Sequence, residues 1–362
     1  MDSPASPPAR QSLERLPRAA QWAVLLAVSL LLAGGLELAA MPAALLIAPM
    51  LAGVAAGTNG ATVRVPGFFF AAAQGVVGCL VAASITASIV TSFTSGWPLF
   101  LTVVLLTLAA SSMLGWLVSR WRILPGSTAV WGSAPGGATA MVMMAEAFGA
   151  DARLVAFMQY LRVIIVTLAA ALIAGLFVDT AATPPPEKEW FPAIDPAGFG
   201  AVIAIVVAGG MMGRLLRLPS PYFLGSVILG AILHLGYGVP LQLPEWLLAV
   251  AYGIIGWRIG LNFTRTILIH AARALPQIVG SILALLAFCG ALAFLLSSQL
   301  GIDPLTAYLA TSPGGLDSVA IIATASESVD LSFVMAMQGA RLLLVLVIGP
   351  WLARLMTRWL AE

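Results

Sequence analysis

The sequence is poor in charge and in the residues that carry most catalytic chemistry. Of its 362 residues, 9% are charged, one is lysine, two are histidine and two are cysteine. Two histidines far apart in the chain cannot build a multi-histidine zinc or copper site, and two cysteines provide neither a disulfide framework nor a CxxC metal pair. Walker loops, dinucleotide fingerprints and nucleophile elbows are also missing. We therefore expect no enzyme activity, no cofactor and no metal centre, and the net charge of +2 gives no reason to expect nucleic-acid binding.

Apolar residues dominate the chain instead. Hydrophobic residues make up 60% of it and the mean hydropathy is +1.02, values that a water-soluble globule does not reach. Most of the long apolar runs approach the roughly 20 residues that a membrane-spanning helix needs. We predict a multi-pass protein of a bacterial-type inner membrane, surrounded by the lipid bilayer. The clearest runs are Ala20–Leu36, Gly67–Val90, Leu99–Val118, Leu154–Val178 and Ile278–Leu296.

Two stretches of the chain, Trp131–Arg162 and Leu309–Arg341, are diverged copies of one motif. The first contains SAPGGATAMVMM and then MQYLR, and the second contains TSPGGLDSVAII and then MQGAR. The PGG triplets are 178 residues apart and the QxxR pairs are 179 apart, and other prolines and glycines match at offsets of 177 or 178. The duplication therefore covers nearly the whole chain. We predict a cytoplasmic tail at 1–16, a first membrane repeat at 17–179, a proline-rich external linker at 180–197 and a second membrane repeat at 198–360.

The arginines decide between two topologies, because positive residues concentrate on the cytoplasmic side of a membrane. If each PGG segment turns back inside the membrane, 13 arginines are cytoplasmic, including Arg265 and Arg273 in one loop, and only Lys188 faces outward. If each segment crosses, the split becomes 9 to 5. We therefore predict an all-α polytopic fold of two inverted repeats of about five transmembrane helices, each with a re-entrant PGG hairpin before its last helix. Both termini are then cytoplasmic.

An inverted repeat brings the tips of the two PGG hairpins together near the membrane midplane. Irregular backbone is tolerated there only where protein or a watery cavity satisfies its polar groups. Helices that begin after the glycines would point their N-terminal amides at a bound anion. The alternative is that PGG is only a tight turn that lets helices pack. The tip residues that we predict to bind substrate are Ser133, Pro135, Gly136, Gly137, Thr139, Thr311, Ser312, Pro313, Gly314, Gly315 and Ser318.

The QxxR pairs lie deep in the last span of each half. Arg162 and Arg341 are each about 10 residues, or roughly 15 Å, into their helices. An arginine at that depth is costly, keeps its proton and usually marks a functional site. Gln159 and Gln338 share the helix faces of these arginines, so each pair can offer amide and guanidinium donors to a carboxylate or phosphate. The alternative is that each arginine caps the backbone carbonyls of the neighbouring hairpin.

The two copies differ after the triplet, where Thr139 of the first corresponds to Asp317 of the second. A carboxylate at this position can bind Na⁺ or carry a proton, so Asp317 is our candidate for the coupling-ion site. The alternative is a structural salt bridge to Arg341. Secondary candidates for the substrate site are Arg258 and Asn262, which share a helix face at i, i+4.

At this point the chain resembles the AbrB-type integral membrane proteins, a family with a duplicated membrane unit and a PGG segment in each copy. The resemblance rests on WGSAPGGATAMVMMAEAFGADARLVAFMQYLRV and TSPGGLDSVAIIATASESVDLSFVMAMQGARLLLV. It implies a role in regulating gene expression, and some members carry the label of ammonia monooxygenase. Neither a DNA-binding module nor a metal constellation stands behind these labels here. The architecture is also similar to glutamate/sodium symporters, whose glycine-rich loops differ from PGG, so glutamate is not implied as a substrate.

We interpret the chain as a secondary active transporter of a small organic anion, working by alternating access around the hairpin tips and paired arginines. Na⁺ or H⁺ would drive it. The alternative is a membrane ligand sensor or regulator of gene expression that uses the same pocket without net transport. A pore for ammonia or another neutral solute fits two buried arginines poorly. The predicted partner is a small anionic solute, and the sequence leaves a homodimer open.

Overall fold

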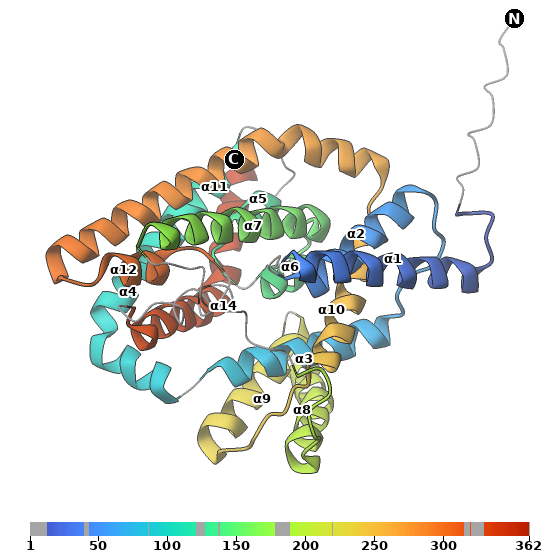
Figure 1. Cartoon of the computed structure of the whole chain (residues 1–362), viewed down its shortest axis with the longest axis horizontal. Coiled ribbons are helices and arrows are strands. Elements are labelled where there is room, and N and C mark those ends of the chain that lie inside the picture. The colour runs from blue at the N-terminus through green and yellow to red at the C-terminus, as the bar shows by residue number, and fades with distance from the viewer. Residues whose placement is uncertain are drawn as a thin grey trace, which may run out of the picture.

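The structure, a computed structural model, describes residues 13–39, 43–85, 87–120, 127–136, 138–177, 189–218, 220–314, 319 and 329–361. Every regular element within these ranges is a helix, which confirms the prediction of an all-α fold (Figure 1). In chain order the helices are α1 (Arg18–Leu38), α2 (Ala44–Thr58), α3 (Gly67–Ser84), α4 (Ala87–Arg120), α5 (Thr128–Ser133), α6 (Ala138–Ala147), α7 (Ala152–Phe177), α8 (Pro196–Leu215), α9 (Pro221–Tyr237), α10 (Glu245–Gly260), α11 (Arg265–Leu300), α12 (Pro304–Thr311) and α14 (Leu331–Ala361).

Seven helices in the described part of the chain are long and apolar enough to cross a membrane. They are α1, α3, α4, α7, α8, α11 and α14, and they identify the protein as a multi-pass membrane protein. The other three predicted spans, α2, α9 and α10, have 15, 17 and 16 residues. Their shortness means that the count of five spans in each half stays a prediction.

Two expected helix boundaries are wrong. The apolar run Gly67–Val90 is not one helix, because α3 ends at Ser84, Ile85 is extended at φ −86° and ψ 98°, and α4 begins at Ala87. The loop expected around Arg265 and Arg273 is instead the first part of α11, which begins at the side-chain cap of Thr264. Hydropathy shows neither feature, since it reports where a chain is apolar and not where the backbone turns.

The described helices follow the same order in the two halves of the chain. Helices α1–α5 and α7 correspond to α8–α12 and α14, and the longest pair, α4 and α11, have 34 and 36 residues. Single hydrogen bonds match as well. The backbone N–H of Asp151 donates to the Thr128 hydroxyl at 3.2 Å, and that of Asp330 donates to the Thr306 hydroxyl at 3.1 Å. The inverted orientation of the two halves and the limits of the repeats stay predictions.

The helices group into two bundles, each built from both halves (Figure 1). We call α1, α2, α3, α8, α9 and α10 the scaffold bundle, and α4 to α7 with α11, α12 and α14 the hairpin bundle. In the scaffold bundle α2 packs on α10 and α3 packs on α9, so each contact joins one half to the other. In the hairpin bundle α4 packs on both α14 and α11. Among the described helices, the most extensive backbone contact between the bundles, α7 against α10, is far smaller than the main contacts within either bundle.

Glycine allows the helices of the scaffold bundle to approach closely. A Cβ atom on Gly225 of α9 would lie 1.9 Å from the carbonyl oxygen of Gly209 in α8. One on Gly260 of α10 would lie 2.2 Å from the carbonyl oxygen of Met50 in α2. These backbones are in contact, as is common where small residues line helix interfaces in membranes. The scaffold bundle is therefore tightly packed at these crossings.

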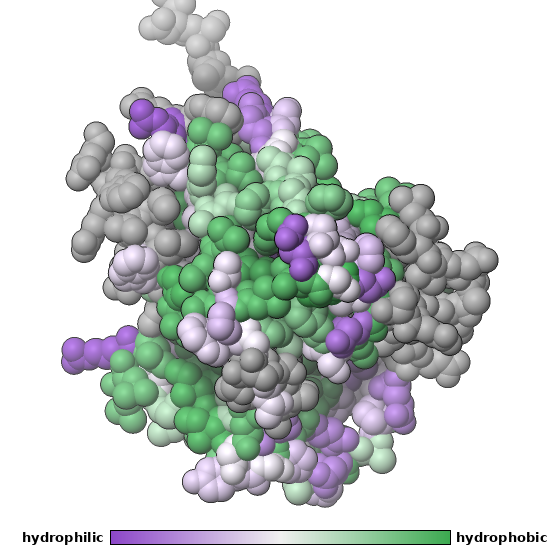
Figure 2. All heavy atoms as spheres, turned by 90° about the vertical axis from the view of Figure 1, so that its left-hand side faces the viewer, coloured by the Kyte–Doolittle hydropathy of each residue, from purple (hydrophilic) through white to green (hydrophobic). Residues whose placement is uncertain are grey.

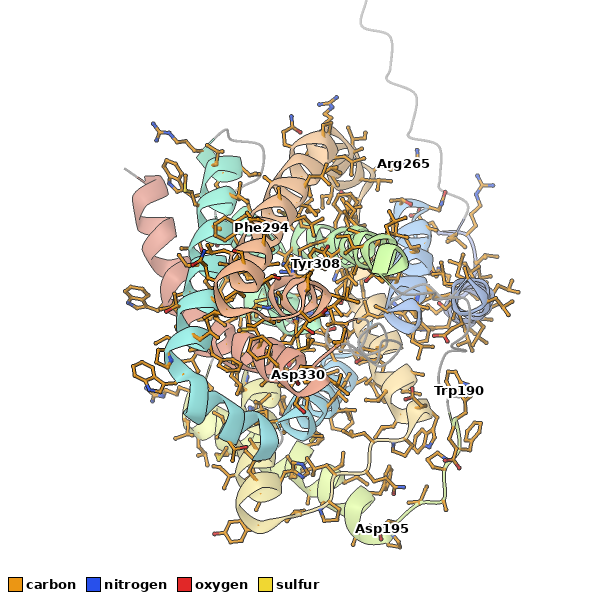
Figure 3. All side chains as sticks on the ribbon, turned by 60° about the vertical axis from the view of Figure 1, so that its left-hand side comes forward. Trp190, Asp195, Arg265, Phe294, Tyr308 and Asp330 are labelled. Atoms are coloured by element: carbon orange, nitrogen blue, oxygen red, sulfur yellow. The ribbon has the colours of Figure 1, made fainter. Side chains whose placement is uncertain are left out.

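Large hydrophobic side chains cover much of the outer surface. Phe294, Leu172 and Val347 are 75%, 74% and 77% exposed, whereas Tyr308 on α12 is buried beside α11. In Figure 2 hydrophobic atoms fill much of the face, and many hydrophilic ones lie toward its upper and lower ends. Figure 3 labels Phe294 and Tyr308 between Arg265 near the upper end and Asp195 near the lower end. Lipid is the solvent that suits such a surface.

Candidate functional site

The first PGG segment interrupts the helical backbone inside the hairpin bundle. Helix α5 ends at Ser133, Ala134 is extended at φ −57° and ψ 126°, and α6 begins at Ala138. Every residue of α5 is buried. A break of this kind leaves the last carbonyls of α5 without helical partners in a place that water does not reach, so other donors must satisfy them.

Gln159 and Arg162 on α7 supply those donors. The Gln159 amide nitrogen donates to the carbonyls of Trp131 and Ala134 at 2.8 and 3.0 Å. The guanidinium donates from Nη1 to Ala134 O at 2.7 Å and from Nη2 to Gly136 O at 3.2 Å. Nη2 also donates to Gln159 Oε1 at 2.6 Å, which locks the two side chains together. Both side chains are almost completely buried.

The second half repeats these bonds at matching positions. The Gln338 amide nitrogen donates to Leu309 O at 2.7 Å and to Ser312 O at 3.1 Å. Arg341 donates from Nη1 to Ser312 O at 2.6 Å, from Nη2 to Gly314 O at 3.2 Å, and from Nη2 to Gln338 Oε1. The backbone acceptors lie 178 residues after their counterparts in the first half, and the glutamine acceptor lies 179 after its counterpart. We call each set of bonds a QxxR cap.

The QxxR caps show that the arginines bind the backbone carbonyls of the neighbouring break, which is the alternative that the sequence left open. A cation at the C-terminus of a helix also compensates the negative end of the helix dipole. The terminal nitrogens of each guanidinium are therefore already engaged by protein acceptors. Among the described residues, Nε of Arg162 and Nε of Arg341 are buried and have no partner.

Each break contacts the last long helix of the other half. A Cβ atom on Gly136 would lie 3.0 Å from Val345 of α14, and one on Gly314 would lie 3.5 Å from Val166 of α7. The two arginines are close enough for their charges to repel each other, and Cys289 of α11 lies within electrostatic range of both. The breaks and their caps therefore form one central region with a high density of positive charge.

The described residues place no carboxylate within ion-pair distance of Arg162 or Arg341. The hydrogen-bond partners of these two arginines in the described residues are backbone carbonyls and glutamine side chains, all of which are neutral. A buried cation without a counter-charge costs several kcal/mol in a medium of low dielectric constant. Dipoles of the α5 and α12 carbonyls offset part of that cost.

The two halves differ beside the caps. In the first half the Thr139 hydroxyl lies 3.3 Å from the Tyr160 hydroxyl, whereas Tyr160 corresponds to Gly339 in the second half. The Ser133 hydroxyl is buried without a partner among the described residues, whereas its counterpart Thr311 donates to Cys289 O at 3.1 Å. The central region is therefore not symmetric at the level of side chains.

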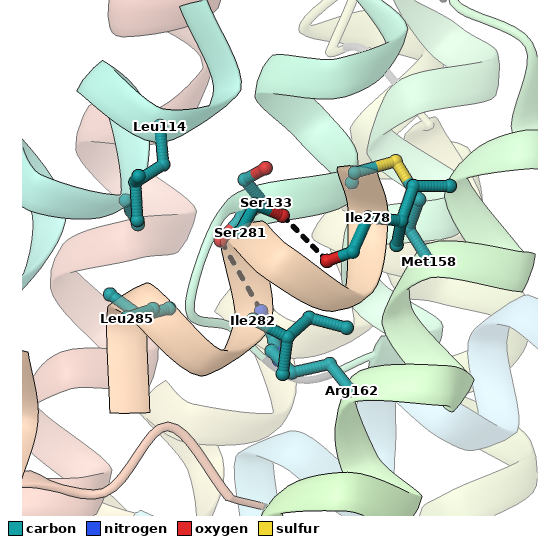
Figure 4. Close-up of a pocket in the computed structure, with 10 residues that line it drawn as sticks. Leu114, Ser133, Met158, Arg162, Ile278, Ser281, Ile282 and Leu285 are labelled. Carbon is teal, nitrogen blue, oxygen red and sulfur yellow. Dashed lines mark hydrogen bonds between the residues drawn. The ribbon is translucent and has the colours of Figure 1, made fainter. Parts of the chain in front are cut away.

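A cavity lies beside the first cap, between α4, α5, α7 and α11 (Figure 4). The space in it that is open to a water-sized molecule is about 10 Å³, room for about one water. An organic anion of several heavy atoms does not fit in this conformation. The lining residues are Ser111, Leu114, Gly132, Ser133, Met158, Arg162, Ile278, Ser281, Ile282 and Leu285.

The structure brings together most of the predicted site residues. Ser133, Gly136, Gln159 and Arg162 form one cap with its break, and Ser312, Gly314, Gln338 and Arg341 form the other, with Pro135, Pro313 and Thr311 buried beside them. Gly137, Gly315, Asp317 and Ser318 lie outside the described residues. Tyr160, Cys289, Ser111 and Ser281 are nearby polar residues that the sequence analysis missed. No group of three metal-ligating side chains occurs in the described ranges.

Arg258 and Asn262 lie in a separate cluster, at the contact between the bundles. Asn262 caps α10 by donating to Arg258 O at 2.7 Å, and its own carbonyl accepts from Arg153 of α7 at 2.9 Å. Arg258 lies 3.6 Å from Glu146 of α6. Arg258 and Asn262 therefore share no hydrogen-bond partner with the QxxR caps. We call this group of residues, with Asp151, the polar latch.

Asp151 is the anionic member of the polar latch on the side of α7. Its carboxylate accepts two hydrogen bonds from the Arg153 guanidinium, at 2.8 and 2.7 Å. Burial opposes ionisation of this half-buried carboxyl, but the hydrogen bonds and charge of Arg153 outweigh burial and lower its pKa. The pair therefore holds the start of α7 while Arg153 reaches across to the scaffold bundle.

The helices and the two capped breaks define a polytopic all-α membrane protein with a duplicated broken-helix motif. Within that class, the chain belongs to the family described as Transition state regulatory protein AbrB, whose model matches residues 45–357 and includes both breaks. It is 47% identical over 340 residues to the "Putative regulator AbrB" of Escherichia coli (strain K12), covering 94% of this chain and 97% of that one. It is 25% identical over 307 residues to the "Uncharacterized protein YhjN" of Bacillus subtilis (strain 168), covering 80% and 78%. No solved structure matches the chain.

Proposed function

We propose that this protein is a secondary active transporter of a small organic anion, which binds between the two helix breaks. The observation that carries the proposal is the pair of buried arginines, one from each half, with neutral partners throughout the described residues. Neither guanidinium can lose its proton near neutral pH, so the region stays cationic. Binding an anion there would remove much of the cost of keeping two charges out of water.

The QxxR caps change the way in which the anion is expected to bind. Nη1 and Nη2 of both arginines already donate to backbone carbonyls. We therefore do not expect a carboxylate to accept two parallel hydrogen bonds from one guanidinium group. The positive potential of the pair would attract it, and the free backbone N–H groups in the first turn of α6 would donate to it. Thr139 lies in that turn, and Ser133 is the last residue of α5 on the other side of the break.

Alternating access needs the region to open, since the cavity beside Arg162 admits about one water. The small contact between the bundles favours a movement of the hairpin bundle against the scaffold bundle. The polar latch lies on that contact and would open or re-form as the bundles move. Asp317, placed by sequence alone, remains our candidate for coupling the movement to Na⁺ or H⁺. We keep the inner membrane, cytoplasmic termini and a homodimer as expectations.

A second candidate function is a membrane sensor that binds the same anion and regulates a partner without net transport. It is favoured by the family description and by the printed name of the Escherichia coli relative, both of which refer to regulation. The two functions share a binding site and differ only in whether the ligand crosses the membrane. Labelled-substrate counterflow therefore separates them.

Binding can be tested with Cys289, which is buried close to both arginines. Purified protein carrying Cys79→Ala would be reacted with N-ethylmaleimide in the presence of two- to four-carbon carboxylates, with lactate and succinate as first probes. We expect a bound carboxylate to raise Tm and to change the rate of labelling at Cys289. Cys79, buried in α3 of the scaffold bundle, serves as the matched control in a Cys289→Ala background. An unchanged Tm and unchanged labelling with every carboxylate would contradict an anion site between the breaks.

A further inference from the structure

The end of helix α8 carries an unusual backbone conformation. Arg217, two residues after the last residue of this helix, has a φ of 51°, in the left-handed region that favours glycine. Wherever else in the described part of the chain such a residue closely follows a helix, it is glycine. These glycines are Gly60, Gly149, Gly238 and Gly301, after α2, α6, α9 and α11. Arginine at position 217 is therefore costly for the backbone, and strain of this kind clusters at functional sites.

The turn around Arg217 is held firmly. The N–H of Arg217 donates to Arg214 O at 3.1 Å and the N–H of Leu218 donates to Gly213 O at 2.9 Å, the two bonds of a Schellman motif. Helices α8 and α9 lie side by side on either side of the turn (Figure 1). A Cβ atom on Gly213 would lie 2.1 Å from the carbonyl oxygen of Pro221, so the two backbones are in contact. The exposed side chain of Arg217 therefore starts from a fixed point.

Arg214, in the last turn of α8, is a second exposed cation beside this turn. Its guanidinium lies over the ring of Tyr222, 5.8 Å from the ring centre, and Nη1 donates to the Tyr222 hydroxyl at 3.3 Å. That hydroxyl keeps its own proton, which it can donate to another acceptor. Among the described residues, neither arginine has a carboxylate partner and the Arg217 guanidinium has no hydrogen-bond acceptor. The two arginines and the tyrosine therefore offer free donors to an anion.

Compensation of the helix dipole does not account for Arg217. A cation near a helix C-terminus is favourable, but Arg214 already provides one, and glycine at 217 would form the same turn without strain. Other arginines have partners within the protein. Arg265, at the start of α11, donates to Thr58 O at 3.2 Å, and Arg64 donates to two carbonyls of its own loop. A ligand of Arg217 would explain both the strain and the free guanidinium.

Apolar side chains surround the two cations. Leu215 and Leu216, which lie between them in the sequence, are 82% and 60% exposed. A ligand that contacts both kinds of side chain has an acidic group next to a hydrocarbon part. The bilayer around a membrane protein supplies such a ligand in its anionic phospholipids. The phosphate would accept hydrogen bonds from the arginines, and the acyl chains would cover the leucines.

We propose that the turn between α8 and α9 is a binding site for one anionic phospholipid, whose headgroup is held by Arg214, Arg217 and the Tyr222 hydroxyl. The site lies in the scaffold bundle and shares no residue with the QxxR caps. It stands whether or not the protein moves a solute across the membrane.

The first half of the sequence lacks the three residues of this site. Their counterparts, 177 residues earlier, are Glu37, Ala40 and Leu45. A glutamate at the end of α1 would repel a phosphate, and neither alanine nor leucine can donate a hydrogen bond from its side chain. We therefore expect one such lipid site in each chain.

The test is thermal unfolding of the delipidated full-length protein in a neutral detergent, with increasing amounts of phosphatidylglycerol or phosphatidylcholine. We expect phosphatidylglycerol to raise Tm, and phosphatidylcholine, which has no net charge, to raise it less at the same concentration. Glycerol 3-phosphate, which has the phosphate without acyl chains, should have little effect. Equal shifts with the two lipids, or an equal shift with glycerol 3-phosphate, would overturn the proposal.

Arg217→Gly separates lipid binding from folding. Glycine adopts a φ of 51° without strain, so we expect the delipidated variant to unfold at a temperature no lower than that of the wild type. The concentration of phosphatidylglycerol needed for a given shift should rise about tenfold or more, because charge-assisted hydrogen bonds are lost. A wild-type response to phosphatidylglycerol would overturn the proposal. A lower Tm without lipid would do so too, since Arg217 would then have a structural partner.

Arg273→Gln is the matched control, because it removes one exposed positive charge from a regular part of α11. It should respond to phosphatidylglycerol as the wild type does, and an equal loss of response would mean that only the total charge matters. Native mass spectrometry gives a second readout. The wild type should retain one more phosphatidylglycerol than Arg217→Gly, and equal numbers of retained lipids would refute the site.

Discussion

The two broken helices are held in the same way but lie in different surroundings. At both breaks a glutamine and an arginine from the last long helix donate to carbonyls at matching positions, and the distances agree within a few tenths of an ångström. Beside the first break are a tyrosine, a small cavity and a serine hydroxyl that has no partner in the described ranges. Beside the second, a threonine hydroxyl is bonded to α11 and a glycine replaces the tyrosine. The QxxR caps, which the two halves share, hold the helix breaks in place. The side chains beside the caps differ between the halves, and we expect ligand specificity to depend on them.

The largest expected effect tests whether the two caps are equivalent. Arg162→Met and Arg341→Met each remove the guanidinium donors of one cap and leave the buried carbonyl of Gly136 or Gly314 without a donor, and we expect each to lower the free energy of unfolding by about 3 kcal/mol. Thermal or denaturant unfolding in detergent measures the loss. Arg120→Met is the control, because Arg120 is exposed and stacks on Trp116, a contact worth about 0.5–1 kcal/mol. A large loss in only one half would show that the caps are not equivalent.

The hydroxyls at the two breaks should differ in their contribution to stability. Thr311→Val removes a hydroxyl that donates to Cys289 O, and we expect it to cost about 1 kcal/mol. Ser133→Ala removes a hydroxyl that has no partner among the described residues, so we expect no loss of unfolding free energy. Parallel denaturant titrations compare the two variants. Equal losses would mean that the Ser133 hydroxyl has a structural partner of its own.

The tyrosine pair exists in the first half alone. Tyr160→Phe and Thr139→Val should each cost about 0.5–1.5 kcal/mol, and the double variant should cost less than the sum because the two hydroxyls bond each other. A double-mutant cycle of unfolding free energies measures this coupling. Tyr308→Phe, on α12, provides a control that should be additive with Thr139→Val. Full additivity of Tyr160 and Thr139 would remove this difference between the halves.

The smallest expected effect concerns the aspartates that begin the last long helices. Asp151 has Arg153 two residues on, whereas the corresponding Asp330 is followed by Ser332 at that place. Because Arg153 lowers the pKa of Asp151, the pair stabilises the native state above the unfolded pKa of about 4 and loses that contribution as pH falls through the folded pKa. Both side chains are partly exposed, so we expect less than about 1 kcal/mol.

Unfolding measured from pH 6 down to pH 3 checks this contribution. Asp151→Asn should remove the part of the acid-induced loss that depends on Arg153, and Arg153→Gln should give the same profile. If both variants keep the pH profile of the wild type, the ion pair does not contribute to stability. Asp330→Asn serves as the comparison from the second half, and we expect it to lack this dependence on an arginine.

Much of the fold followed from the sequence, because composition and a long-range duplication report on the solvent and the architecture. The i, i+3 spacing also placed Gln159 with Arg162 and Gln338 with Arg341 on one helix face each. It could not show what these side chains bind, since the acceptors are backbone carbonyls that any residue possesses. Only the packed helices bring those carbonyls to the guanidinium groups.

Other features lay within reach of the sequence and were missed. Applying the offset residue by residue pairs Tyr160 with Gly339 and Ser111 with Cys289, which are the positions where the two halves differ most in chemistry. Nothing in the sequence indicated the helix break at Ile85, because the chain is apolar on both sides of it. The extension of α11 to Arg265 runs against the charge pattern, since arginines there suggested a loop. Helical backbone at a membrane surface carries charged side chains as readily as a loop does.

The central claim is that an anion crosses the membrane at the region between the two caps, and counterflow tests it most directly. Proteoliposomes loaded with unlabelled succinate or lactate would be diluted into the labelled compound, with Arg341→Lys as the variant, after its folding has been verified by size-exclusion chromatography. The account predicts transient accumulation of label with the wild type and a strong reduction with the variant. Binding of the same carboxylate without counterflow would contradict transport and favour a sensor.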